Sequence, residues 1–376
     1  MERDLRAFMG TIDTFDPRFR RRQRRVFLWA ARVPFSSYQL VAKWDSLGDL
    51  ARPSDDERYA RADDVAVPVT EERYRIGGFD ESEAVEDVFF TFVKRDGAWL
   101  IASDDDFADV GLQSTRHLWD FGPVATSRSS HFLMLRHPCG SSIGCVALGE
   151  GLLALAERGL EQVESYWSAP WSKKVVLLVP TTTRELRMIL QATLDLDNFV
   201  AFASSTVDTE EGFDFGGHRI LLNPSAFLGR TESSALTILA HELLHVATRT
   251  VSGPFVPTVV EEGIAEYIGY DADPGALAFF ESQVEEGRFV GSLPQDYEFV
   301  TGSATDVYTS YQEAHSAVAF FVQRWGMDKL VGFYRRLGEP AIVAGTARYH
   351  VSRALRATIG IGEERFEALW ADSIRS

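Results

Sequence analysis

The spacing of apolar residues divides this chain into two parts that are patterned differently. After an arginine-rich helical opening, the first part carries short runs of aromatic and β-branched residues, which are typical of strands. These predicted strands are Ser37 to Trp44, Arg73 to Phe79, Val88 to Val93 and Trp99 to Ser103. Asp96-Gly97 lies between the last two, and it predicts a hairpin because a type I′ turn prefers residues that tolerate positive φ.

The second part combines short strand-like runs with longer apolar segments at helical spacing. The strands are predicted at Val175 to Val179, Phe199 to Val207 and Arg219 to Leu222. The helices are predicted at 182–190, 234–250, 258–270, 308–326, 327–337 and 363–374, with caps expected at Thr182, at Ser233 or Ser234, and at Thr258. This order predicts an α+β fold. A chain of 376 residues is longer than a domain with a single hydrophobic core normally is. We therefore expect an accessory α+β domain at 1–138 and a second domain at 139–376.

The strongest chemical signal is the run His241-Glu242-Leu243-Leu244-His245, which lies within a mostly apolar helical segment. Two histidines four positions apart share a helix face, so both imidazoles can reach one ion. A catalytic zinc takes three protein ligands and keeps an open position for water, and two histidines with one glutamate are an established set. Glu262 completes that set, and Glu242 is then placed to take a proton from the water. The alternative is a surface helix with two incidental histidines, which the apolar context disfavours.

The run HELLH, followed after sixteen residues by the Glu262 of VVEEGIAEY, resembles the gluzincin metallopeptidases, the group of thermolysin and the zinc aminopeptidases. The resemblance implies one zinc ion and a zincin domain with a mixed sheet, an active-site helix and a helical C-terminal subdomain. It also implies that the third ligand is Glu262, which stands just before a small residue, rather than Glu261. Glu266, one turn further on, matches an acid that orients a zinc-bound histidine. A solvated helix charge is the alternative for Glu266.

The segment from Tyr308 to Gly326 resembles the helix that follows the site in the same peptidases. Tyr311 and His315 are four apart and share a face, and the resembling families use both a tyrosine and a histidine as donors to the oxyanion. The sequence does not choose between them, and either could instead close the edge of the core. The resemblance further implies an edge strand that pairs with extended peptide substrate; Asn198 to Ser204 is the candidate, with a buried strand as the alternative.

The first part of the chain resembles, in pattern only, the cone-shaped domains of nuclear transport factor 2 and the ketosteroid isomerases. A helix comes first, then a curved antiparallel sheet with a Trp-bearing strand in WLIASDDD. The resemblance implies an accessory role. We expect the acidic run 104–106 and the arginine cluster at 18–25 to be solvated rather than a second site. An alternative is a small hydrophobic ligand in this domain, which an apolar pocket there would favour.

The net charge of −17 argues against nucleic acid as a partner, because phosphate binding needs a basic surface. No apolar run approaches eighteen residues, so we expect a soluble chain without a membrane span.

Cys139 and Cys145 fit a small disulfide loop and two buried thiols equally well. The oligomeric state is open. So is the compartment, and an extracytoplasmic or cell-envelope location would need an upstream export segment of the kind that many resembling proteins carry.

Together these patterns predict a zinc-dependent metallopeptidase that hydrolyses peptide bonds in a peptide or protein substrate. The alternative is a zincin fold that has lost turnover and binds a peptide or an envelope component. Glu242 discriminates between them, because a binding module has no need of the general base. Cleavage preference and the choice between endo- and exopeptidase action do not follow from these motifs.

Overall fold

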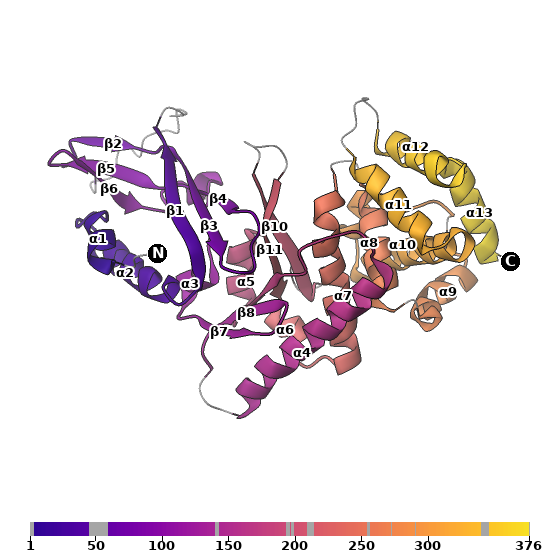
Figure 1. Cartoon of the computed structure of the whole chain (residues 1–376). Helices are drawn as coiled ribbons and strands as arrows, with labels where there is room; N and C mark the ends of the chain where they lie inside the picture. The colour runs from indigo at the N-terminus through magenta and orange to yellow at the C-terminus, as the bar shows by residue number, and fades with distance from the viewer. Residues whose placement is uncertain are drawn as a thin grey trace. The chain divides into compact units, whose positions relative to one another are not determined.

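The computed structural model describes residues 4–44, 59–139, 143–192, 196, 199–208, 214–253, 256–271, 273–289, 291–339 and 346–375. The fold is α+β, which confirms the predicted class (Figure 1). Contacts divide the chain into two compact units. Unit 1 comprises Met1–Leu153 and Lys174–Gly229, and unit 2 comprises Ala154–Lys173 and Arg230–Ser376.

The N-terminal elements of unit 1 are helices followed by two three-stranded antiparallel sheets, in the orders β1-β3-β4 and β2-β5-β6. Their bounds are α1 (Leu5–Gly10), α2 (Pro17–Ala30), β1 (Phe35–Lys43), β2 (Asp64–Ala66), β3 (Val69–Ile76), β4 (Ala84–Val88), β5 (Thr91–Arg95) and β6 (Ala98–Ser103). Asp96 and Gly97 form the predicted hairpin loop, since both have positive φ, 49° and 79°. The strand predicted at 88–93 is instead split between β4 and β5, because the Phe89 amide donates to Ser114 Oγ at 2.8 Å rather than to a neighbouring strand.

A five-stranded mixed sheet completes unit 1, in the order β10-β11-β9-β8-β7. Its strands are β7 (Ala125–Arg128), β8 (Phe132–Arg136), β9 (Val175–Val179), β10 (Ala201–Asp208) and β11 (Asp214–Leu222), and α3 (Leu118–Phe121), α5 (Thr183–Leu190) and α6 (Pro224–Phe227) belong to the same unit. β8, β9 and β11 run parallel. The predicted strand at 175–179 is confirmed as β9. The expected domain boundary at residue 138 lies inside unit 1, because β8 and β9 are hydrogen-bonded neighbours on either side of it.

β10 lies at an edge of this sheet and pairs with β11. The predicted substrate-pairing segment, 198–204, overlaps β10 from Ala201 onward, and residue 198 lies outside the described residues. Beyond the edge, the amide of Val85 in β4 donates to Thr206 Oγ1 at 3.1 Å. The pairing of this strand with a peptide stays a prediction.

Unit 2 is helical, and apart from α4 its helices lie after residue 230 (Figure 1). They are α4 (Ile143–Tyr166), whose first residues belong to unit 1, α7 (Glu232–Thr248), α8 (Thr258–Gly269), α9 (Ala278–Glu285), α10 (Ala304–Trp325), α11 (Met327–Gly338), α12 (Ala347–Ile359) and α13 (Glu363–Arg375). α8 packs against both α7 and α10. In the core, the buried Trp370 donates its indole N–H to Ser316 Oγ at 3.1 Å. The predicted C-terminal helices are confirmed as α11 and α13.

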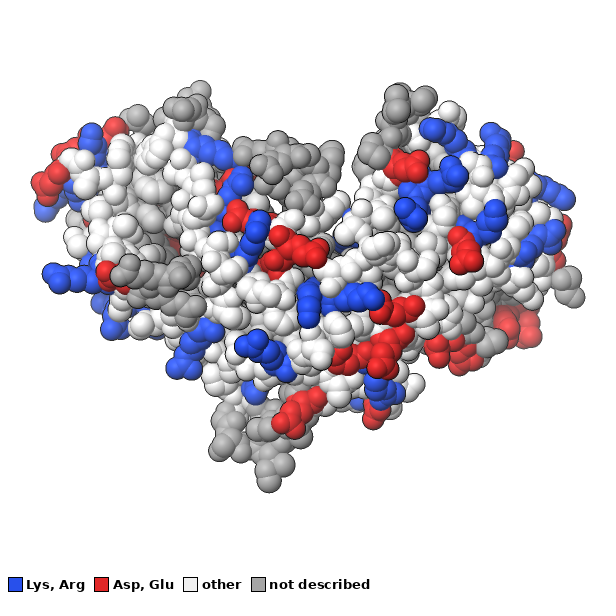
Figure 2. Space-filling model, viewed as in Figure 1, with Lys and Arg blue, Asp and Glu red and all other residues white. Residues whose placement is uncertain are grey.

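The surface of the described residues carries both signs of charge. On the face drawn in Figure 2, lysine and arginine side chains are interspersed with aspartate and glutamate side chains. Among the described helices, none combines the length and the hydropathy that crossing a bilayer requires.

The two cysteines lie at the join between the predicted domains. Cys139 is disulfide-bonded, and no free cysteine occurs among the described residues. The side chain of Cys145 lies outside the described residues.

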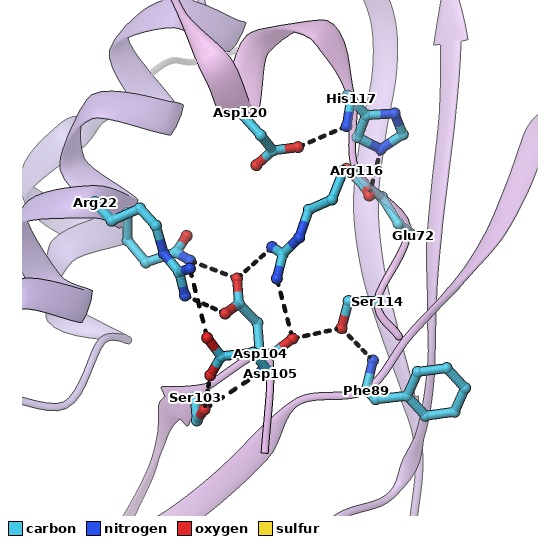
Figure 3. Close-up of polar contacts among 11 residues, drawn as sticks. Arg22, Glu72, Phe89, Ser103, Asp104, Asp105, Ser114, Arg116, His117 and Asp120 are labelled. Carbon is cyan, nitrogen blue, oxygen red and sulfur yellow. Dashed lines mark hydrogen bonds and ion pairs between the residues drawn. The ribbon is translucent and has the colours of Figure 1, made fainter. Parts of the chain in front are cut away.

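A partly buried ion pair connects the arginine-rich helix α2 to the end of β6 (Figure 3). Asp104 is only 2 % exposed and accepts hydrogen bonds from Arg22 and, at 2.6 Å, from Arg116. The prediction of a solvated acidic run is therefore wrong for Asp104, and Arg22 does not belong to a solvated helix face. Arg22 and Asp104 are 82 positions apart, so no local pattern reveals their pairing.

A buried histidine, His117, forms a second ion pair in unit 1. Its Nε2 lies 2.8 Å from Glu72 Oε2 (Figure 3), and Glu72 also accepts a hydrogen bond from the Tyr38 hydroxyl. Burial works against the charged imidazole, but the charges of Glu72 and Glu86 raise the pKa of His117 to about 9. At neutral pH the imidazole is therefore a cation held between carboxylates.

We expect the free energy of unfolding to fall as the pH rises from about 7 to about 10. A histidine with a pKa raised on folding stabilises the fold fully below its unfolded pKa, and this contribution is lost as the pH passes through about 9. The loss is on the order of 3 kcal/mol. Urea denaturation at stepped pH measures it, and His117→Gln should remove this part of the slope. An unchanged slope in the variant would assign the pH dependence to other groups.

Candidate metal centre

The two histidines of the HELLH run lie on α7 as the spacing predicts. The helix begins after Thr231, whose hydroxyl accepts from the Ser234 amide at 3.3 Å, so the predicted cap at Ser233 or Ser234 is corrected to Thr231. His241 and His245 follow each other on one face, with ring centroids 4.8 Å apart. Their Nε2 atoms are 3.1 Å apart. Both imidazoles therefore present the same ring nitrogen to a common point.

Helix α8 brings a carboxylate to the same point. Glu262 Oε2 lies 3.2 Å from His241 Nε2 and 3.4 Å from His245 Nε2. Thr258 is the first residue of this helix, whose N-cap is Pro257, so the predicted cap at Thr258 is wrong.

Two glycines let α8 approach its neighbours closely enough to place Glu262. A Cβ at Gly263 would lie 2.7 Å from the Ala314 carbonyl oxygen in α10, and one at Gly269 would lie 3.0 Å from the Thr237 carbonyl oxygen in α7. A larger side chain at either position would push the helices apart. This close packing explains in physical terms why a glycine directly follows the predicted ligand.

The three donor atoms match a zinc ion in both chemistry and spacing. Zinc binds imidazole nitrogen and carboxylate oxygen at about 2.0–2.2 Å, so tetrahedral geometry separates two such ligands by about 3.4 Å. The three separations here are 3.1, 3.2 and 3.4 Å. The His241, His245 and Glu262 side chains are each partly accessible, which leaves room for a further ligand. These residues therefore fit a zinc ion with three protein ligands.

Glu266 contacts the back of the first histidine. Its Oε1 lies 3.2 Å from His241 Nδ1, on the opposite side of the ring from the nitrogen that faces Glu262. A carboxylate in this place holds Nδ1 as the donor and leaves Nε2 free to bind a metal. Of the two readings of Glu266 from the sequence, this contact favours the orienting role over a solvated charge.

The carboxylate charges dominate the electrostatics of the centre. Burial alone would raise the pKa of Glu262, but the charge of His245 and hydrogen bonds with both imidazoles hold that pKa well below its usual range. Burial likewise opposes a charged His241, whose pKa is nevertheless raised by its hydrogen bonds with Glu262 and Glu266. The carboxylate is therefore ionised at neutral pH and available as a ligand.

Glu242 directly follows His241 on α7, and Tyr311 lies near the ring of that histidine. Glu242 is 8 % exposed, and the ring of Tyr311 is centred 6.5 Å from the ring of His241. Burial, followed by the charges of Glu262, Glu242 and Glu266, raises the pKa of Tyr311 well above its usual value. The phenol therefore stays protonated at neutral pH and keeps a hydroxyl that can donate.

His315 occupies a different environment one turn further along α10. It stacks on Tyr270 at 5.8 Å between ring centroids and meets Tyr267 edge to face at 5.9 Å. It is 1 % exposed, and burial lowers the pKa of His315 to about 4, so the ring is neutral at pH 7. Its Nδ1 has no hydrogen-bond partner among the described residues. The ring contacts of His315 are with Tyr267 on α8 and with its C-cap Tyr270, whereas the ring of Tyr311 lies near that of a predicted ligand, His241.

The tyrosines around His315 were not singled out from the sequence. Tyr267 follows Glu266 on α8 and Tyr270 is the C-cap of that helix, and Tyr308 packs against Phe279 with ring centroids 4.9 Å apart. The only signal for Tyr267 is its place at the end of the EEGIAEY run.

Unit 1 also contains an apolar cavity of about 250 Å³, remote in sequence from these residues. Its wall is formed mainly by Phe8, Ile12, Val26, Phe27, Phe35 and Leu40. This is the feature that favours the alternative of a small hydrophobic ligand in the N-terminal part, and such a ligand stays a prediction.

Comparison with models of known protein families and with curated proteins finds no match for this chain.

Proposed function

We propose that this protein is a zinc-dependent metallopeptidase of the kind that the HELLH and EEGIAEY runs resemble. The observation that carries the proposal is the convergence of two imidazole nitrogens and one carboxylate oxygen at 3.1–3.4 Å from one another, with Glu242 in the same turn of helix. Two packed helices, α7 and α8, supply these atoms from partly buried side chains, which makes an incidental surface arrangement a poor explanation.

Each side chain of the centre has a distinct role in the proposed hydrolysis. His241, His245 and Glu262 would hold a zinc ion, which when bound supplies Lewis-acid activation of water and of the scissile carbonyl. Glu242 would accept a proton from the attacking water and deliver it to the leaving amine. Tyr311 would donate its hydroxyl hydrogen to the oxyanion of the tetrahedral intermediate.

We expect Tyr311→Phe to lower kcat by about 100-fold with little change in KM, because the lost hydrogen bond forms only in the transition state. Steady-state kinetics on a cleaved peptide measures this. Tyr308→Phe, one turn earlier on the same helix, is the matched control and should retain activity. If His315→Gln abolished turnover while Tyr311→Phe did not, the oxyanion donor would be His315.

Glu266→Gln is expected to weaken zinc binding by about 10- to 100-fold, the usual effect of removing an orienting carboxylate. Competition with a chromophoric chelator measures the affinity. Glu281→Gln, on α9, changes the same charge away from the centre and serves as the control. Equal zinc affinity in both variants would show that Glu266 is an ordinary charged residue of the helix and does not orient His241.

A peptide-library digest tests the proposal as a whole. Zinc-loaded protein should cut peptides, and chelated protein should stop cutting until zinc is restored, with the products read by mass spectrometry. The absence of cuts from zinc-loaded protein, together with retained peptide binding, would favour the catalytically silent binding module. Glu242 is the feature that argues against that module, because peptide binding alone does not require a buried carboxylate beside the metal ligands.

A further inference from the structure

Helix α2 presents a row of arginines to solvent. Its apolar side packs into unit 1, where Phe19 is buried and Val26 and Phe27 line the apolar cavity of about 250 Å³. The helix contains no acidic residue. A turn of 3.6 residues places all of its exposed residues on one side, within about a third of the circumference. These residues are Pro17, Arg18, Arg21, Arg24, Arg25 and Leu28, and the four arginines among them form the arginine face.

The protein does not neutralise the charges of the arginine face. None of its four arginines forms an ion pair with a carboxylate in the part of the chain that the structure describes. Arg25 lies 5.8 Å from the ring of Trp29, a contact that holds the guanidinium but leaves its charge in place. Arg22 of the same helix differs, because it points to Asp104, as Figure 3 shows. The arginine that reaches a carboxylate of the fold is therefore paired, and the outer four are not.

The arginine face does not serve the stability of the helix. Arg21 lies three or four positions from each of the other three arginines, and like charges at these spacings destabilise a helix. Arg18 stands in the first turn, where the positive end of the helix dipole disfavours a cation. An external array of negative charges would remove both repulsions. The face therefore matches a partner that carries many anionic groups.

Exposed apolar side chains at the arginine face indicate which polyanion fits. Leu28 lies on the same side of the helix and is 40 % exposed. Phe15, directly before the N-cap Asp16, is 45 % exposed although Arg95 lies over its ring. A bilayer interface accepts both kinds of group, because lipid phosphates bind guanidinium groups and the acyl boundary accepts apolar side chains. A nucleic-acid backbone presents phosphates but no such apolar layer.

The net charge of −17 does not prevent this contact. At physiological ionic strength the field of an exposed charge falls off over about 8 Å, so acidic residues elsewhere on the surface do not cancel the arginine face. The same acidic residues would be repelled by an anionic surface. They therefore favour one orientation, in which α2 faces the surface.

We propose that the arginine face of α2 docks on an anionic lipid bilayer, with its guanidinium groups on lipid phosphates and Leu28 entering the interface. The apolar side of α2 stays packed in unit 1, so the contact is peripheral and the helix lies along the surface. The docking depends neither on zinc nor on the proposed peptidase activity.

Co-sedimentation of the full-length protein with lipid vesicles tests this inference. One vesicle population is phosphatidylcholine alone, and in the other about a third of the lipid is anionic phosphatidylglycerol. The protein should bind the anionic vesicles at least about tenfold more tightly, and about 0.5 M salt should release it, because screening weakens the attraction between surface charges. No binding to the anionic vesicles, or equal binding to both populations, would overturn the inference.

Paired arginine variants locate the contact on α2. Arg21→Gln combined with Arg25→Gln should weaken binding to anionic vesicles at least about tenfold, since each arginine near such a surface contributes about fivefold. Arg335→Gln combined with Arg336→Gln removes the same charge from exposed positions on α11 and should bind as the unmodified protein does. With circular dichroism showing folded protein, undiminished binding in the α2 variant, or equal weakening in both variants, would contradict the proposal.

Leu28→Gln separates a bilayer from a soluble polyanion. The substitution should weaken binding to anionic vesicles about threefold or more, because an apolar side chain that enters the interface is lost. Retention on immobilised heparin, which offers anionic groups without an apolar layer, should not change. Unchanged vesicle binding in Leu28→Gln, together with tighter binding of the unmodified protein to heparin or duplex DNA than to vesicles, would assign the arginine face to a soluble polyanion and overturn the inference.

Discussion

Replacement of Glu242 by glutamine is expected to lower kcat for peptide hydrolysis by about 1,000-fold or more while the protein retains its zinc. The amide keeps the size of the side chain but cannot accept a proton from water, so only the proton transfers are lost. Glu242 is not one of the three predicted zinc ligands, so the variant keeps all three. Kinetics and metal analysis on the same preparation measure both halves of this expectation.

Glu232→Gln is the control for this variant, because it removes the same charge from an exposed position in the first turn of α7. It should retain full activity. If Glu242→Gln cleaved peptides at an undiminished rate, the general base would have to be another residue and the proposed mechanism would be wrong.

The second large effect is expected from the pair of adjacent glutamates on α8. Glu262→Gln should weaken zinc binding by more than about 100-fold, beyond what the loss of an orienting carboxylate costs, and should abolish hydrolysis. Glu261→Gln should do neither. Glu261 faces away from the histidines and accepts hydrogen bonds from Ser252 at 2.8 Å and Tyr334 at 3.3 Å. Competition with a chelator measures the affinity of both variants.

These neighbours form a stringent control, since each substitution removes one carboxylate from the same turn of the same helix. Loss of zinc in Glu261→Gln, with zinc retained in Glu262→Gln, would reverse the assignment of the third ligand. Equal loss in both would indicate a general effect on α8 rather than the removal of a ligand.

The parts of the fold that were predicted correctly depend on local patterns. The Asp96-Gly97 hairpin follows from the two residues that tolerate positive φ, and β9 follows from a β-branched run closed by Pro180. The convergence of His241, His245 and Glu262 also has a local basis, because helical spacing sets the histidines and a glycine beside the glutamate permits close packing. The geometry agrees with the expected cluster, and its function stays a proposal.

The parts that were missed depend on contacts between distant residues. The burial of Asp104 requires arginines from α2 and from residue 116, and the inclusion of 174–229 in unit 1 requires the pairing of β8 with β9. α4 was missed because it begins inside a glycine-rich stretch that indicates a loop. The periodicity of apolar residues indicates which face of a helix or strand is buried. It does not indicate which other element packs against that face.

X-ray absorption spectroscopy on the purified, zinc-loaded protein tests the central claim most directly. The account predicts one tightly held zinc per chain, with two imidazoles and oxygen donors at about 2.0–2.2 Å in the first coordination shell. Zinc that dialyses away from the unmodified protein, or a shell without two imidazoles, would contradict it.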